Sequence, residues 1–326
     1  MLKIFRGSSG LQLVLILLAA VALWMPALIH PRPMPAPEPC GPMYSTLYRL
    51  FQGFEVIPSA VAFLLLLGEA IILNNALARL SLLPRNSYIT AFIFVILMSS
   101  WPAYLTLHPM LFSAMFVILS MRMLLRIYDK EDPFMEVLNA GLFLAIATMF
   151  SVSALPIFFL IWICLIVFRI MSWREWAISV IGFALPFAFL LTYYYVSDSL
   201  TSHLADYKMI FSHIGRLGYE TGFSTWNFIY FGLLALIALM SVWRLITTVG
   251  EKNINLRKIF LAVFWMFFLS LSCLMIGAEQ PDMKATMAML PLSIMLAHNY
   301  IVSRKMLMNE LLFLLFITAI ILQKFL

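Results

Sequence analysis

The sequence predicts an all-α integral membrane protein that forms a single polytopic domain over residues 1–326. Of its 326 residues, 63% are hydrophobic and only 11% are charged. A soluble globule with this composition would expose more apolar surface than its polar residues can cover. The apolar residues also fall in runs of about 20, which is the length of a helix that crosses the hydrocarbon core of a bilayer. Composition and run length therefore both predict a chain that folds within a membrane.

Eleven apolar runs define the predicted spans. Hydropathy windows of about 19 residues place them at 11–29, 56–78, 87–105, 109–127, 134–150, 154–171, 174–196, 226–247, 258–276, 285–303 and 309–325. Two proline-bearing breaks, SSWPAYLTLHP and SVSALP, separate neighbouring runs. Since proline disfavours the helical state in the residue before it, each break predicts a tight helical hairpin.

The distribution of positive charge predicts the orientation. Cytoplasmic loops collect Lys and Arg. If the N-terminus is cytoplasmic, only six of the 21 Lys and Arg fall on the outer side, namely Arg32, Arg49, Lys208, Arg216, Lys284 and Lys324. We therefore expect eleven helices, N-in and C-out. The short inner loops account for the net charge of +6, so we expect no nucleic-acid binding.

Two long segments lie on the outer side in this topology, at 30–55 and 197–225. In the first, proline occupies every second position from Pro31 to Pro39. Proline fixes φ, so this run predicts an extended strap without internal hydrogen bonds. Residues 43–54 then place their apolar side chains on one helical face, which predicts a helix that lies in the membrane interface.

Three polar residues lie at a similar depth within predicted spans. Glu69, Arg122 and His298 are each about 20 Å from the outer face, at about 1.5 Å per helical residue. Intramembrane ionisable groups mark candidate functional sites. Two interpretations stay open: a polar path through the bundle, or a neutralised Glu69–Arg122 pair with Arg122 extended toward the cytoplasm.

The outer segments also contain acids that could hold a divalent cation or act as a general base. These are Glu38 and Glu55 in the first segment and Asp198 and Asp206 in the second. Phosphate-binding loops, zinc spacings and the motifs of soluble hydrolases do not occur in the sequence, so no other cofactor is predicted.

Two stretches resemble a known group of proteins. LNNALARLSLLPRNSYITAFIFVILMSSWP (73–102) and REWAISVIGFALPFAFLL (174–191) are similar to a family of bacterial multi-pass membrane proteins that is sometimes labelled beta-carotene 15,15'-monooxygenase. Carotenoid cleavage enzymes share a soluble propeller with four iron-binding histidines. The five histidines of this chain are scattered between the outer face and the membrane and form no such set: His30, His108, His203, His213 and His298.

The layout resembles the glycosyltransferase C superfamily, whose members take sugars from polyprenyl-phosphate carriers. Those proteins begin N-in, have an interfacial helix in the first outer loop and have another long outer loop after helix 7. The resemblance implies that Glu55 or Glu38 acts as base or metal ligand, and that Arg49 and Arg216 meet the donor phosphate. The superfamily usually has an aspartate in the first loop, and here only these glutamates could replace it.

Two other function classes fit the same sequence. One is a transporter or lipid flippase that uses the layer of Glu69, Arg122 and His298. The other is a non-catalytic assembly subunit that packs against another membrane protein. The expected partners are accordingly membrane lipids, a polyprenyl-phosphate-linked sugar, or a membrane protein.

Overall fold

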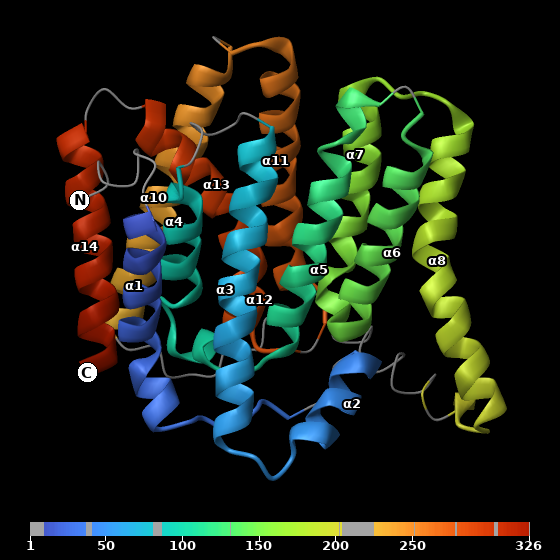
Figure 1. Ribbon diagram of the computed structural model, residues 1–326, viewed down its shortest axis with the longest axis horizontal. Coiled ribbons are helices and arrows are strands. Elements are labelled where there is room, and N and C mark those ends of the chain that lie inside the picture. Colours follow the sequence, from blue (N-terminus) through green and yellow to red (C-terminus); the bar gives the residue numbers. More distant parts are fainter. Residues whose placement is uncertain are drawn as a thin grey trace.

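The computed structural model describes residues 10–36, 41–80, 87–130, 132–201, 203, 225–250, 252–277, 279–302 and 306–325, and these are helical with short connections (Figure 1). The α-helices are α1 (Gly10–Ile29), α2 (Pro42–Phe51), α3 (Val56–Arg79), α4 (Ile89–Met98), α5 (Pro109–Leu124), α6 (Phe134–Phe150), α7 (Phe159–Phe168), α8 (Trp173–Val196), α10 (Thr225–Val249), α11 (Ile254–Ser272), α12 (Pro281–Lys284), α13 (Thr286–Val302) and α14 (Met306–Phe325). Short 3₁₀ helices η2 (Pro102–Leu105), η3 (Ile127–Asp129), η4 (Val152–Phe158) and η5 (Cys273–Met275) connect some of them.

The all-α fold class is confirmed. Within the described part of the chain, six segments are long and apolar enough to cross a membrane: α1, α3, α8, α10, α11 extended through η5, and α12 with α13. Shorter apolar helices occupy the other predicted spans. The number of crossings and the N-in orientation stay predictions.

Two helices form the centre of the bundle. All ten residues of α4 are buried, and almost all of α13 is buried as well. α4 packs on α13, and α1, α3, α5, α10 and α11 pack around this pair. α14 packs against α10 at the edge of the bundle (Figure 1).

A second group of helices extends from α5. α6 packs between α5 and α8, and α7 contacts α8 and α11. A glycine in each helix allows α6 and α8 to approach closely: a Cβ at Gly182 would lie 2.6 Å from the Leu138 carbonyl oxygen, and a Cβ at Gly141 would lie 2.9 Å from the Ser179 carbonyl oxygen. Backbone-to-backbone contact through small residues is a common way for membrane helices to associate.

α2 lies across one end of the bundle, which we call the α2 end (Figure 1). Gly41, just before α2, sits so close to the backbone of Met149 and Phe150 at the end of α6 that no side chain fits there. The Tyr44 hydroxyl donates to the carbonyl oxygens of Pro35 (2.9 Å) and Leu107 (3.3 Å). These contacts fix the predicted interfacial helix to both the strap and the bundle.

α2 is amphipathic, as predicted. Some of its apolar side chains are buried against the bundle and others are exposed. Tyr44 is completely buried, whereas Met43 and Leu50 are exposed. Exposed apolar side chains on a helix that lies across the end of a bundle fit a position at the lipid boundary.

Candidate functional site

The two proline-bearing breaks fold as 3₁₀ turns at the α2 end and place buried serines there. In the first break, Trp24 Nε1 donates to Ser99 Oγ at 2.9 Å. Ser100 Oγ donates to the Leu97 carbonyl and lies 2.5 Å from the Tyr230 hydroxyl on α10. Since the single Ser100 proton goes to Leu97, Tyr230 is the donor of the second bond. Non-helical backbone at membrane depth is tolerated only where protein surrounds it, and these turns are buried.

The second break binds the connection between α11 and α12. Ser151 Oγ donates to Glu279 Oε1 at 2.5 Å, and Ser153 Oγ contacts Glu279 Oε2. Ser153 also donates to the Ile276 carbonyl at 2.6 Å. The buried Lys284 ammonium donates to the Gly277 carbonyl at 2.8 Å. Charged groups are buried here with hydrogen-bond partners, so the network fixes the position of α12.

α12 places one carboxylate beside an aromatic cluster. Asp282 is half-buried, and its Oδ2 accepts a hydrogen bond from Trp101 Nε1 at 3.1 Å. The Trp101 ring lies 5.0 Å from Tyr230 and 4.9 Å from Phe231, measured between ring centroids. A carboxylate and three aromatic rings from α10, α12 and the first break therefore meet at the α2 end.

A large groove starts at this carboxylate and runs between α10, α11 and α13. Its volume is about 890 Å³, within the range of sites that bind small molecules. Leu234 and Ala238 on α10, Phe267 and Leu271 on α11, and Ala288 on α13 are among its lining residues. Among the lining residues that the structure describes, Asp282 is the only one that is not apolar. An apolar groove with a single charge at one end matches a long hydrocarbon chain with a polar headgroup.

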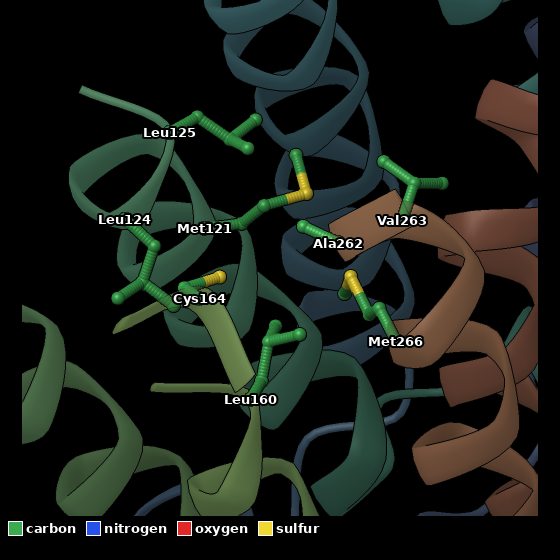
Figure 2. A pocket seen from close by; sticks show the side chains of 8 residues that line it. All are labelled: Met121, Leu124, Leu125, Leu160, Cys164, Ala262, Val263 and Met266. Atoms are coloured by element: carbon green, nitrogen blue, oxygen red, sulfur yellow. The ribbon is translucent and has the colours of Figure 1, made fainter. Parts of the chain in front are cut away.

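A second apolar cavity, between α5, α7 and α11, is too small to be a site. The side chains of Met121, Cys164 and Met266 are among those that surround it (Figure 2). Its volume is about 10 Å³, which is no more than one water molecule needs, and an apolar space of this kind stays dry. We interpret it as a packing defect.

The acids and arginines predicted for catalysis are only partly within the described residues. Glu55 directly precedes α3, and Arg49 lies on α2; both side chains are exposed at the α2 end. Asp198 follows α8 and is exposed, with a left-handed φ of 52°. Glu38, Arg216 and Asp206 lie outside the described residues. In the described part of the chain, no three or more His, Cys, Asp or Glu side chains gather in a way that could hold a metal ion.

The three members of the predicted intramembrane layer have separate surroundings. Glu69 is fully buried in α3, and neither carboxyl oxygen has a hydrogen-bond partner among the described residues. Arg122 is partly buried near Arg79 and Arg126, which carry the same charge. His298 Nε2 lies 3.0 Å from Thr248 Oγ1 on α10. None of the contacts among the described residues joins the three side chains.

His108 is a further buried polar residue at the α2 end. Its Nδ1 accepts a hydrogen bond from the Leu111 N–H at 3.3 Å and so caps the N-terminus of α5. Complete burial lowers the pKa of His108 from 6.5 to about 3. The imidazole is therefore neutral at physiological pH.

Sequence reasoning missed Asp282, Trp101 and Glu279. The signals were present: serines precede Pro102 and Pro156 in the breaks, and the stretch AEQPDMK introduces three charges before an apolar run. Polar residues are, however, common in the connections between membrane spans, so these residues did not stand out as a site. Only the fold shows that two breaks far apart in the sequence meet the α11–α12 connection.

Comparison with known proteins finds no matching family model, no matching curated protein and no matching solved structure. The class of protein therefore follows from the fold and the groove alone: a helical protein of membrane-embedded character with an apolar groove in its bundle.

Proposed function

We propose that this chain is a multi-pass protein of the bacterial inner membrane that binds a long-chain lipid within its bundle and acts on it at the outer face. In this proposal all eleven predicted spans cross the membrane, N-in and C-out, and the α2 end is the outer face. The observation that carries it is the groove of about 890 Å³ between α10, α11 and α13, lined by apolar side chains with a carboxylate at one end.

Lipid retention tests this proposal. The purified full-length chain should carry lipid that is detectable by mass spectrometry after extraction. Ala238→Trp places an indole in the groove and should remove most of that lipid. Leu236→Trp is the matched control, because Leu236 is on the same helix, is exposed and does not line the groove. Equal retention by both variants, or no lipid in the unmodified protein, would contradict the proposal.

The reaction we propose is sugar transfer from a polyprenyl-phosphate donor to the bound lipid. The exposure of Glu55 and Arg49 at the α2 end supports it, since an acid and a cation there are accessible to a donor in the outer leaflet. Glu55 or Glu38 would act as base or metal ligand, and Arg49 and Arg216 would bind the donor phosphate through charge-assisted hydrogen bonds.

Substitution of the two glutamates tests the reaction separately from lipid binding. One of the single variants, Glu55→Gln or Glu38→Gln, and the double variant should retain lipid but lose glycan product. Full activity in all three variants would exclude both residues as base or metal ligand.

A lipid transporter is the second candidate, and Glu69 is the observation that favours it. Glu69 is fully buried, and its carboxyl group has no hydrogen-bond partner in the described part of the chain. Such a group is costly within a membrane and is typical of the proton-carrying groups of transporters. If the chain is a proton-coupled transporter, Glu69→Gln should abolish lipid movement between leaflets of a reconstituted vesicle and leave lipid retention intact.

A further inference from the structure

The groove has a charge pattern that selects among lipid headgroups. Of the described residues, Asp282 is the only charged one that lines it. The nearest cation along the chain, Lys284, donates its hydrogen bond to the Gly277 carbonyl and does not line the groove. Among the described residues, no Lys, Arg or His forms an ion pair with Asp282. Within the described part of the chain, the carboxylate is therefore available to a positively charged ligand.

The geometry of Asp282 leaves one carboxylate oxygen, Oδ1, available to a positively charged group of a ligand. Trp101 Nε1 donates to Oδ2, and an indole N–H can only donate, so it holds this oxygen as an acceptor. Within the described part of the chain, Oδ1 accepts no hydrogen bond. The hydrogen bonds of Glu279 to Ser151 and of Lys284 to the Gly277 carbonyl fix α12, so the carboxylate is held in place before a ligand binds.

The neighbouring rings favour the same kind of ligand. Phe231 lines the groove and lies 4.9 Å from Trp101, measured between ring centroids, and Trp101 in turn contacts Asp282. Aromatic faces attract ammonium groups within about 6 Å of the ring centroid, and more strongly where water is excluded. A carboxylate next to aromatic rings repels phosphate and carboxylate headgroups and attracts alkylammonium groups.

We propose that the groove binds a long-chain lipid whose headgroup carries an ammonium group, which pairs with Asp282 beside Trp101 and Phe231. This inference rests on the proposed lipid-binding function and names the class of lipid. An anionic polyprenyl phosphate is disfavoured next to Asp282. In the sugar-transfer reaction, the groove therefore holds the acceptor lipid, and the donor phosphate binds elsewhere.

The test uses saturated amphiphiles of one chain length that differ only in the headgroup: primary amine, trimethylammonium, hydroxyl, carboxylate and phosphate. Each is offered to the purified full-length protein in mixed micelles, and the retained fraction is measured by native mass spectrometry. The two ammonium probes should be retained about tenfold more tightly than the carboxylate and phosphate probes, a difference of about 1.4 kcal/mol.

Variants assign that preference to the carboxylate. Asp282→Asn should remove the preference while the hydroxyl probe still binds, and Asp282→Glu should retain most of it. Asp132→Asn, an exposed acid between α5 and α6, is the matched control and should bind as the unmodified protein does. Thermal melting in detergent checks that each variant is folded, and Asp282→Glu keeps the test decisive if Asp282→Asn does not fold.

The outcomes separate this inference from the proposed function. Equal retention of all headgroups, preference for the anionic probes, or an unchanged preference in Asp282→Asn would overturn the ammonium assignment but leave lipid binding in place. Failure to retain any probe, with Ala238→Trp indistinguishable from the unmodified protein, would overturn the lipid-binding function itself.

Discussion

Individual residues at the α2 end hold α12 in place through burial and through a backbone conformation that only glycine adopts readily. Gly277 is the clearest case, because its φ of 83° is a conformation that other residues rarely adopt. A Cβ there would also collide with Ser153 Oγ and Glu279 Oε2. The same glycine presents the carbonyl oxygen that binds Lys284.

Replacing this glycine tests whether the network holds the α2 end together. Gly277→Ala should lower the free energy of unfolding by about 1–3 kcal/mol, because it adds backbone strain and displaces the Ser153–Glu279 contact. Thermal melting in detergent measures the change. Gly250→Ala, at a position with open space around it, is the control; an equal loss in both variants would contradict this account.

His108 predicts an acid sensitivity with a defined sign. Between pH 6.5 and about 3, the unfolded chain binds a proton that the folded protein excludes, so stability falls as the pH falls through this window. His108→Asn keeps an N-cap side chain but cannot titrate. The melting temperature of this variant should decline less than that of the unmodified protein between neutral pH and about pH 4. Equal declines of the melting temperature in both proteins would show that groups other than His108 determine the acid sensitivity.

Most helices were predictable, because most apolar runs long enough to cross a bilayer form one long helix. The runs 87–105 and 154–171 instead form the ten-residue helices α4 and α7, each next to a 3₁₀ turn. The predicted span 56–78 and α3 (Val56–Arg79) differ by one residue at one end. The breaks were predictable too, from Pro102 and Pro156. The pairing of elements was not, because contacts such as Ser151 with Glu279 join residues 128 positions apart. Hydropathy along the sequence does not show which distant segments contact each other. The groove forms between three such segments, so it was not predicted.

The contact between α6 and α8 gives a prediction at the scale of these elements. Gly182→Ala should separate the two helices and lower the free energy of unfolding by about 1–3 kcal/mol. The reason is that its Cβ would lie 2.6 Å from the rigid Leu138 carbonyl oxygen. Limited proteolysis and thermal melting report the loss. Gly232→Ala is the control, since this glycine lies inside α10 with nothing within 4 Å. Gly232→Ala should leave the stability of α10 unchanged or raise it by up to about 1 kcal/mol.

For the whole molecule, the assignment of the α2 end to the outer face is the assumption that every functional role shares. Thr46, on α2, and Asp132, between α5 and α6, are both exposed. In a background with its three cysteines replaced by serine, a membrane-impermeant maleimide should label Thr46→Cys on intact cells. It should label Asp132→Cys only after permeabilisation. The reverse pattern would place the groove opening and the carboxylate on the cytoplasmic side.

The central position of α4 has a consequence for the surrounding lipid. Its ten residues extend about 15 Å at 1.5 Å per residue, about half of a hydrocarbon core. A helix this short in contact with acyl chains would incur hydrophobic mismatch, and would thin the bilayer or tilt its neighbours. Every residue of α4 is instead shielded by other helices. Reconstitution into longer or shorter acyl chains should therefore tilt the peripheral helices and leave α4 unchanged.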